Sequence, residues 1–310
     1  MELQQLLAET AQRKASDLHL KSGSKPILRI HGHLEVQDDL PLITREFIDK
    51  TAEGLLGERR LRMLMEGREM DLGYMLPGVG RFRCNLFLAM GEVRGVFRHV
   101  PERIPPFQEL HLPKVLERLS MERRGMLLVT GITGSGKSTT LASMIDFMNR
   151  SRNDHIVTIE DPIEFVHQDK KCVMSQREIG HDSMNFAQAL RAALREDPDI
   201  MLVGELRDVE TMEVGLHAAE TGHLVMSTLH TLNAAETINR MISMFPPHQE
   251  EQIRGQLASV IQGIVSQRLV VRADGRGRVP AVEIMIATGL IRDCIREAEK
   301  TPQIPSVVAP

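Results

Sequence analysis

The chain contains no tryptophan, one tyrosine and three cysteines among its 310 residues. Cys84, Cys172 and Cys294 are scattered, which excludes a disulfide framework and a zinc site of paired cysteines and favours a reducing, cytoplasmic compartment. No apolar run reaches the roughly 18 residues of a membrane-spanning helix. The N-terminal residues lack the basic and apolar regions of a signal peptide. A net charge of −4, without a long basic run, argues against a dedicated nucleic-acid-binding protein.

The overall composition of the sequence is typical of a soluble globular protein. Hydrophobic residues make up 42% of the chain and charged residues 26%. The length suits two domains of ordinary size. Eighteen methionines are suited to filling irregular gaps in a core.

Residues 131–138 read Gly-Ile-Thr-Gly-Ser-Gly-Lys-Ser and fit the pattern G-x-x-x-x-G-K-[ST] of a phosphate-binding loop. Glycines let the backbone approach a polyphosphate, while successive N–H groups and the N-terminus of the next helix attract the anion. The motif requires a strand before it and a helix after it, and Met126–Thr130 and Lys137–Arg150 fit these roles. The lysine would reach the β- and γ-phosphates of ATP, and the serine hydroxyl would bind Mg²⁺. The expected nucleotide-binding residues are Gly131, Thr133, Gly134, Ser135, Gly136, Lys137, Ser138 and Thr139, with Ser138 as the Mg²⁺ ligand.

Residues 1–100 are predicted to form a smaller α+β domain with a mostly antiparallel sheet. Helices are predicted at residues 3–13 and from Arg45 to about Gly67, the second with an interruption at Gly54–Gly57. Strands are predicted at Asp17–Lys21, Pro26–His31, His33–Val36, Met70–Met75, Arg81–Met90 and Glu92–Val100. Residues 101–113 contain four prolines and are predicted to be a linker.

Residues 114–310 are predicted to form an α/β domain, in which strands and helices alternate around a sheet with a parallel core. The predicted strands are Met126–Thr130, His155–Ile159, Ile200–Val203 and Leu224–Leu229. The predicted helices are Lys137–Arg150, Ser183–Glu196, Val209–Glu220, Asn233–Met244 and Glu250–Val271. The last helix is based on apolar residues at helical spacing from Ile253 to Leu269. Further helices are expected beyond Pro310.

Polar residues follow the ends of the predicted strands, where ligands bind in sheets of this kind. Glu160, Asp161 and Glu164 follow the second strand, Glu205 the third and His230 the fourth. Beside a phosphate loop, these residues suit ATP hydrolysis, with carboxylates that hold Mg²⁺ and orient the attacking water and a histidine near the γ-phosphate. Asp161 is a further candidate Mg²⁺ ligand. As alternatives, the acids could cap a helix or end a solvated strand, and the histidine could be structural.

Two pairs of arginines are candidate contacts to phosphate. If two strands form a hairpin that turns at Met90-Gly91, Arg83 lies directly opposite Arg98. Opposed cations destabilise a sheet unless an anion lies between them, which predicts a contact to a nucleotide held by a neighbouring subunit. The alternative is a solvated face with the guanidinium groups apart. Arg191 and Arg195 share one face of a predicted helix, and they could bridge subunits, contact phosphate or form surface salt bridges.

Four motifs together resemble those of the secretion and pilus traffic ATPases, a RecA-like branch of the P-loop ATPases. Residues 131–139 resemble the Walker A motif of this family, and Thr158–Glu164 resembles its Asp box. Asp199–Asp208 resembles its atypical Walker B motif, in which Gly204 stands where other families have aspartate, and Thr221–His230 resembles its His box. The resemblance covers nearly the whole chain and is strongest to the type IV pilus retraction ATPases of the family.

The resemblance implies a RecA-like ATPase core, a PAS-like N-terminal domain and the cofactors ATP and Mg²⁺. It implies a homohexamer in which the N-terminal domain packs on the ATPase core of the next subunit, ATP binds between the two domains and turnover rotates them. It also implies a location at the inner face of the cytoplasmic membrane, with an inner-membrane pilus platform protein as partner and pilin as an indirect one. Neither nucleic acid nor stably bound zinc is expected. The implied catalytic carboxylates are Glu164 and Glu205, beside Glu160 and His230 from the strand ends, and the implied arginines that reach a neighbour's nucleotide are Arg83 and Arg98.

Two features of the resemblance imply retraction. ATPases of pilus assembly and type II secretion usually carry a paired C-x-x-C zinc module and a further N-terminal domain, and this sequence has neither. Residues 289–297 resemble a short C-terminal motif associated with retraction, from which Gly289, Leu290, Asp293 and Cys294 depart. The alternatives are an ATPase for pilus assembly, secretion or DNA uptake, a RecA-like nucleic-acid motor and a scaffold that binds ATP but barely hydrolyses it.

Overall fold

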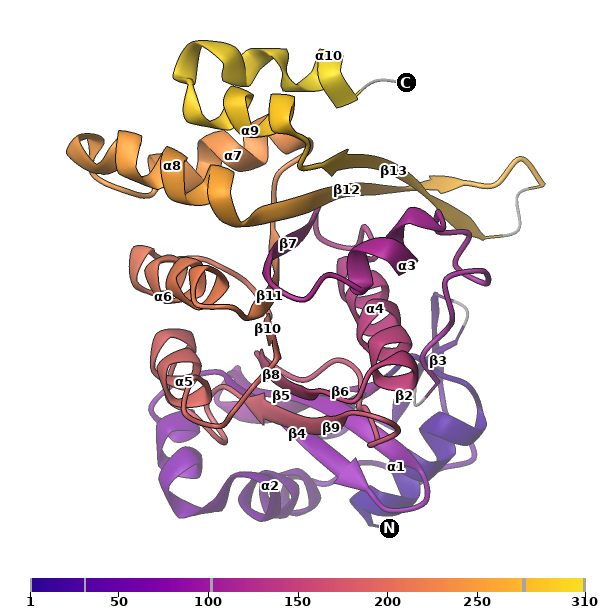
Figure 1. Cartoon of the computed structure of the whole chain (residues 1–310). Coiled ribbons are helices and arrows are strands. Elements are labelled where there is room, and N and C mark those ends of the chain that lie inside the picture. Colours follow the sequence, from indigo (N-terminus) through magenta and orange to yellow (C-terminus); the bar gives the residue numbers. More distant parts are fainter. Residues whose placement is uncertain (1, 31, 101–102, 275–276, 309–310) are drawn as a thin grey trace. The chain divides into compact units, whose positions relative to one another are not determined.

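The computed structural model describes residues 2–30, 32–100, 103–274 and 277–308 (Figure 1). It divides the chain into two compact units, each with its own sheet. The first unit comprises the residues up to Arg103 and the segment Glu164–Val166, and the second comprises the other residues from Ile104 onward. His31 of a predicted strand, Pro101 and Glu102 of the predicted linker, and the last proline lie outside the described residues.

The described residues of the first unit form a six-stranded sheet of order β3-β2-β1-β6-β5-β4, in which every pair of neighbours is antiparallel as predicted. Apolar residues of two helices pack on one face of this sheet, around Phe82 and Phe97. The longer helix is broken at Gly57, within the predicted interruption, where φ is 66°. The elements are α1 (Leu3–Gln12), β1 (Asp17–Lys21), β2 (Ile27–Ile30), β3 (His33–Val36), α2 (Arg45–Met65), β4 (Met70–Leu76), β5 (Gly80–Ala89) and β6 (Glu92–Val100).

Strands β5 and β6 form the predicted hairpin, and its register places Arg83 opposite Arg98. Met90 and Gly91 make the turn with φ values of 57° and 76°. A two-residue turn with positive φ at both positions matches the twist of the flanking strands. The expected pairing of the two arginines is therefore confirmed.

The same sheet supplies carboxylates to these two arginines. Arg98 Nε lies 2.8 Å from Asp17 Oδ1, and Arg83 Nε lies 3.8 Å from Asp71 Oδ1. Burial alone would raise the pKa of Asp17, but hydrogen bonds from Ser16 and Arg98 outweigh burial and lower the pKa from its ordinary 3.8. Because the opposed cations are balanced within the sheet, their register alone does not require a phosphate between them.

The described residues of the second unit form a seven-stranded sheet of order β13-β12-β7-β11-β10-β8-β9. Neighbours from β12 to β9 pair in parallel, and β13 pairs antiparallel with β12. The predicted α/β class is thus confirmed. The elements are α3 (Val115–Ser120), β7 (Gly125–Thr130), α4 (Lys137–Ser151), β8 (His155–Glu160), β9 (Val173–Glu178), α5 (Phe186–Ala193), β10 (Ile200–Val203), α6 (Val209–Glu220), β11 (Leu224–Leu229), α7 (Ala234–Ser243), α8 (Glu250–Val260), β12 (Ile261–Val271), β13 (Arg278–Ile286), α9 (Gly289–Arg296) and α10 (Ile304–Val308), with 3₁₀ turns at Pro247–Gln249 and Ala298–Gln303.

Helices cover both faces of this sheet (Figure 1). Along β7, Leu127 and Val129 belong to a core that includes residues of α3 and α4. Met126 and Leu128 belong to the core on the other side, which includes residues of α5, α6, α7 and α8. A strand buried on both faces reads as a continuous apolar run, as β7 does.

The predicted helix Glu250–Val271 is wrong in its second half. Helix α8 ends and β12 begins at Ile261, and β12 lies between β7 and β13 in the sheet. Ile264 and Val265 fit helical spacing, but β-branched residues also favour a buried strand. Periodicity alone does not separate a buried strand from a buried helix, and parallel pairing with β7 gives this segment its place in the sheet.

Other elements are shorter than predicted or absent from the prediction. The sequence does not predict α3, β9, β13, α9 or α10. Helix α5 is shorter than the predicted Ser183–Glu196, because the Asn185 side chain caps its N-terminus by accepting from Gln188 N at 2.8 Å. Arg195 consequently lies beyond the end of α5. The prediction that it shares a helical face with Arg191 is therefore wrong.

The three cysteines are free thiols, and each is buried in a hydrophobic core. Cys84 lies in the core of the first unit, and Cys294 and Cys172 lie in the two cores of the second. Burial raises the pKa of the Cys172 thiol, so it stays protonated.

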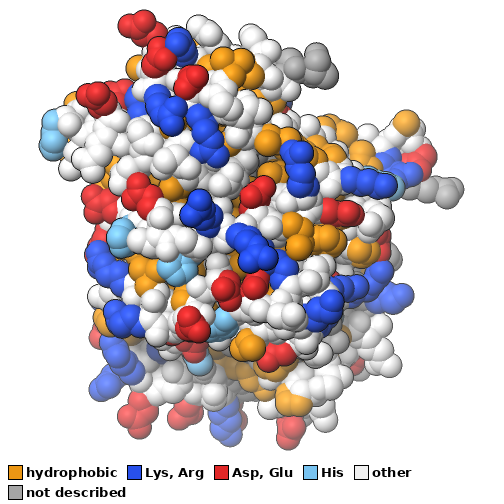
Figure 2. All heavy atoms as spheres, in the orientation of Figure 1, with side chains coloured by type: hydrophobic (Ala, Val, Ile, Leu, Met, Phe, Trp, Pro, Cys, Tyr) orange, Lys and Arg blue, Asp and Glu red, His pale blue; other side chains and the backbone are white. Residues whose placement is uncertain are grey.

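The face drawn in Figure 2 carries acidic and basic side chains interspersed with one another. Such mixing fits the small net charge of −4. Within the described ranges, no helix combines the length and the apolar character that crossing a membrane requires.

We expect Asp17→Asn to lower the stability of the first unit by about 1–2 kcal/mol at pH 7, because it removes a charge-assisted hydrogen bond from a carboxylate that is 6% exposed. Hydrogen exchange of the β1 and β6 amides measures this loss. Since the pKa of Asp17 is lowered, the contribution is complete above its ordinary value of 3.8 and is lost as the pH falls further. The matched control is Asp71→Asn, whose carboxyl is 44% exposed and whose loss costs less than about 0.5 kcal/mol. Equal effects of the two substitutions would contradict the stabilising role of the buried Asp17 carboxylate.

Candidate active site

The phosphate loop connects β7 to α4, as the motif predicts. Gly134 and Gly136 have φ values of 78° and 90°, in the left-handed region that glycine adopts without strain. Gly136 is also the N-cap of α4 and provides no side-chain cap. The first N–H groups of the helix therefore face an anion site without a competing side chain.

Lys137 curls back over this loop. Its Nζ donates to the carbonyl oxygen of Gly131 at 2.8 Å and to that of Ile132 at 3.1 Å, and its side chain is buried. The ammonium group is thus held at the mouth of the loop, where a polyphosphate would meet it. Of the other predicted loop residues, Ser135 is buried, whereas Thr133 is exposed and Ser138 and Thr139 are partly so.

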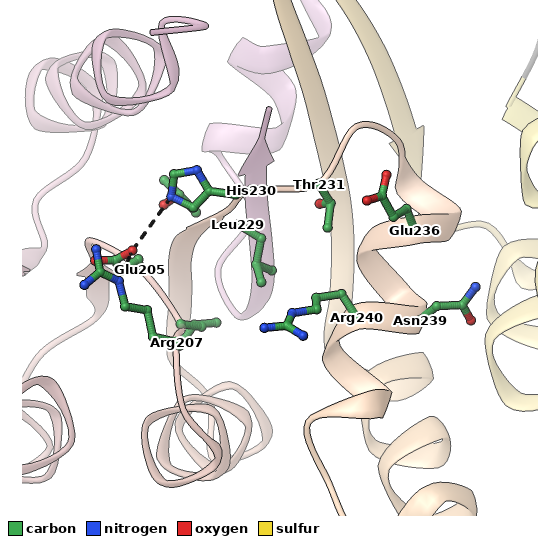
Figure 3. A pocket seen from close by; sticks show the side chains of 10 residues that line it. Glu205, Arg207, Leu229, His230, Thr231, Glu236, Asn239 and Arg240 are labelled. Atoms are coloured by element: carbon green, nitrogen blue, oxygen red, sulfur yellow. Dashed lines mark ion pairs between the residues drawn. The ribbon is translucent and has the colours of Figure 1, made fainter. Parts of the chain in front are cut away.

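Glu205 and His230 lie together at the carboxyl edge of the sheet, as predicted. The parallel strands β10 and β11 end side by side, with Val203 opposite Ser227. Glu205 Oε2 lies 2.5 Å from Arg207 Nε and 3.8 Å from His230 Nε2 (Figure 3). The Glu205 carboxylate is 13% exposed, whereas both of its partners are largely exposed.

Burial lowers the pKa of His230 below its ordinary 6.5, and the charge of Lys137 lowers it further. The Glu205 carboxylate acts in the opposite direction, and Arg207 adds to the lowering. His230 is therefore neutral near pH 7. Because Thr130 pairs with Leu229 just before His230, and His230 lies 3.8 Å from Glu205, the phosphate loop and the strand-end carboxylate meet at one edge of the sheet.

Strand β8 ends at Glu160, within the predicted Asp box, and the Glu160 carboxylate is hydrogen-bonded to two neighbouring side chains. Thr158 Oγ1 donates to Glu160 Oε1 at 2.7 Å, and Gln176 Nε2 donates to the same oxygen at 3.3 Å. Asp161 is exposed and follows directly. Glu164 is exposed and falls in the first unit, so its position among the catalytic groups stays a prediction.

The candidate arginines Arg191 and Arg195 have local partners on the surface. Arg191 Nη1 lies 2.6 Å from Glu210 Oε1, between two half-exposed side chains. Arg195 Nη1 donates to the carbonyl oxygen of Arg191 at 3.3 Å. These contacts agree with the surface alternative, and a role towards another subunit stays a prediction for both, as it does for Arg83 and Arg98.

A pocket of about 640 Å³ opens beside Glu205 and His230 (Figure 3). Arg207 and Arg240 line it from different elements, and the sequence alone predicts a role for neither of them. The sequence does contain a clue to Arg207, because this residue stands two positions after Glu205, in the segment that connects β10 to α6. No local signal marks Arg240, because α7 brings it to the pocket. The remaining lining residues are Leu206, Thr228, Leu229, Thr231, Glu236 and Asn239.

A glycine-rich loop between a buried parallel strand and a helix, with a carboxylate and a histidine at neighbouring strand ends, defines a P-loop ATPase. Residues 106–303 match the family model described as "Type II/IV secretion system protein". The chain belongs to this family, and within it to the nucleotide-binding traffic ATPases of the PilT type.

Individual relatives and solved structures agree with this assignment. The type IV pilus retraction ATPase PilT of Pseudomonas aeruginosa is 45% identical over 308 residues, which are 99% of this chain and 89% of the relative. A twitching motility protein of Neisseria gonorrhoeae is 44% identical over 91% of this chain and 75% of its own length. The crystal structure of the pilus retraction motor PilT with bound ADP matches with a TM-score of 0.93 at 46% identity, over 99% of this chain and 89% of that one. The Legionella pneumophila ATPase DotB matches with a TM-score of 0.87 at 30% identity, over 97% of this chain and 86% of that one.

We expect an NMR titration of the nucleotide-free protein to give His230 a pKa below 6.5. Glu205→Gln should lower this pKa further, because it removes the one carboxylate that raises it. Arg207→Gln should raise it, because it removes a positive charge. A wild-type pKa above 6.5, or shifts of the same sign in both variants, would show that His230 does not share a site with these groups.

Proposed function

We propose that this chain is an ATP-hydrolysing motor that powers type IV pilus retraction from the cytoplasmic side of the membrane. The observation that carries the proposal is geometric: Thr130, which leads into the phosphate loop, pairs with Leu229, and the next residue, His230, has its Nε2 3.8 Å from Glu205 Oε2. This arrangement supports one site made of a phosphate loop and a carboxylate. The similarity to PilT supports the cellular role.

Each group in the site has a distinct task in the proposed reaction. The loop N–H groups and Lys137 bind the β- and γ-phosphates of ATP and offset their negative charge as the γ-phosphoryl group transfers to water. Glu205, whose carboxylate is held by Arg207, accepts a hydrogen bond from the attacking water and orients it. Neutral His230 donates a hydrogen bond towards the γ-phosphate, and the products are ADP and inorganic phosphate. Glu164 is the second proposed catalytic carboxylate, and we assign a catalytic role to Glu160 as well.

The residues of the site fit Mg²⁺, which prefers oxygen ligands. Ser138 provides a hydroxyl in the first turn of α4, and Glu205 and Asp161 provide carboxylates that can bind the ion through water. Bound Mg²⁺ would neutralise phosphate charge.

We further propose that the motor is a homohexamer in which residues 1–100 and 114–310 act as two domains joined by the linker 101–113. Arg83, Arg98, Arg191 and Arg195 are the proposed contacts to a neighbouring subunit. An inner-membrane platform protein of the pilus is the proposed membrane partner, and pilin is moved indirectly through it. Nucleic acid has no part in this proposal.

A second candidate is a motor for secretion rather than for pilus retraction. The Legionella ATPase DotB has the same fold over 97% of this chain. A type II secretion system protein E of Xanthomonas campestris is 34% identical over 87% of this chain but only 47% of its own length. The greater identity to PilT over a greater share of both chains favours retraction.

We expect Glu205→Gln to lower kcat for ATP by roughly a hundredfold or more, because it removes the group that orients water, while the Kd for ADP changes less than about threefold. The control Glu220→Gln alters an exposed carboxylate at the end of α6, which accepts a hydrogen bond from Gln256 Nε2 at 3.1 Å, and its kcat should equal that of the wild type. The assay uses protein of measured native mass, and a mass of six chains in the presence of ATP supports the ring. Unchanged kcat in Glu205→Gln would support a scaffold that hardly hydrolyses ATP, and a single-chain mass would contradict the hexamer.

Deletion of the gene from the source cell tests the direction of work. A retraction motor predicts more surface pili together with loss of surface motility, because filaments then grow without being withdrawn. Re-expression of the wild type should restore both properties, and re-expression of Glu205→Gln should restore neither. Cells without pili would indicate an assembly motor, and an unchanged pilus count would favour secretion.

A further inference from the structure

Strand β12 places a buried glutamine directly against the phosphate loop. Gln267 is 3% exposed and follows Ser266, which pairs with Thr130 at the end of β7. The hydroxyl groups of Ser266 and Thr130 also lie 3.0 Å apart. The loop therefore leaves the sheet immediately beside Gln267.

The side-chain amide of Gln267 joins the loop to the first turn of α4. Its Nε2 donates to the carbonyl oxygen of Ser135 at 2.8 Å, and its Oε1 accepts from Thr140 Oγ1 at 2.8 Å. Since a carbonyl oxygen can only accept, the amide nitrogen must face Ser135, and this requirement determines the orientation of the amide.

The nearness of Gln267 also accounts for two of the loop glycines. A Cβ atom at Gly131 would lie 2.3 Å from the backbone oxygen of Gln267, and one at Gly136 would lie 2.8 Å from its Nε2. At Gly134 a Cβ would meet nothing within 4 Å, so only the backbone conformation requires glycine there. The loop is thus packed against Gln267 as well as hydrogen-bonded to it.

We propose that Gln267 is a positioning residue that orients the phosphate loop for nucleotide binding, an inference that rests on the proposed function. In a trans peptide, the C=O of one residue and the N–H of the next point in opposite directions. The bond from Gln267 to the Ser135 carbonyl therefore turns the N–H of Gly136 away from Gln267 and into the loop. It also keeps a carbonyl dipole from facing the polyphosphate, so the loop is ordered for the anion before it binds.

Gln267→Met tests this role, because it removes both hydrogen bonds and keeps a similar side-chain volume. We expect the Kd for ADP and the KM for ATP to rise roughly tenfold, because binding must then order the loop. The kcat should change less than KM, since Lys137 and Glu205 are untouched. Thr140→Val removes one of the two bonds and should cause a smaller rise. The variant that carries both Gln267→Met and Thr140→Val should bind ADP no more weakly than Gln267→Met alone, because Thr140 acts through its hydrogen bond to Gln267.

Gln262→Met is the matched control. Gln262 lies on the same strand, and its Nε2 donates to the carbonyl oxygen of Arg124 at 3.2 Å, before the start of β7 rather than at the loop. Its ADP affinity should equal that of the wild type, whatever its melting temperature.

An unchanged Kd in Gln267→Met with a lowered melting temperature would overturn the inference, because it would show a structural role alone. An equal rise in Gln262→Met would overturn it as well. If Gln267→Met does not fold, Thr140→Val is the test. A raised Kd for ADP in Thr140→Val supports the inference, and an unchanged Kd overturns it. A wild-type protein that binds no ADP would instead contradict the proposed function itself, so the two failures are distinguishable.

Discussion

Parallel hydrogen bonding between β7, β11 and β10 is the constraint on which the site depends. Its register places Thr130 opposite Leu229 and Val203 opposite Ser227, so three strands end at one edge. Side chains secure that edge, because the Ser227 and Thr228 hydroxyls donate to the carbonyl oxygens of Val203 and Gly204 at 2.7 Å each. Residues that are far apart in the sequence thereby meet without a long loop. Their relative positions are fixed as firmly as the strands of the sheet.

The arginines of the chain differ in how firmly they are held. Arg191 and Glu210 are both about half exposed, and such a pair contributes little because water screens it. It can therefore exchange its carboxylate for a phosphate at small cost. Arg98 instead contacts a carboxylate that is only 6% exposed, and removal of its guanidinium would leave this buried charge with Arg29 Nε at 3.9 Å in place of a cation at 2.8 Å. A change of partner therefore costs less free energy at Arg191 than at Arg98.

Local rules explain which parts could be predicted from the sequence. The spacing of the glycines and Lys137 predicts the phosphate loop, and the alternation of the strands around Met90-Gly91 predicts a hairpin register that the structure confirms. The α/β class and the meeting of Glu205 with His230 follow from strand order and strand ends.

Tertiary pairing decides what the sequence could not show. The segment from Ile261 to Val271 fits two periods, and only its pairing with β7 makes it a strand. The contact of Gln267 with the phosphate loop joins residues 132 positions apart, so no short pattern reveals it. Strands β9 and β13 are mostly half-exposed and lie at the sheet edges, where apolar patterning is weakest.

The burial of all three thiols has a practical consequence. Maleimides and other electrophiles must reach the sulfur atom to react with it, and a thiol enclosed in a core is out of their reach. A cysteine introduced on the surface would therefore be the reactive one in the folded chain, with the native cysteines left in place. Fluorophores or spin labels could then be attached at chosen pairs of positions, and the distance between the labels could be followed during ATP turnover without changing the core.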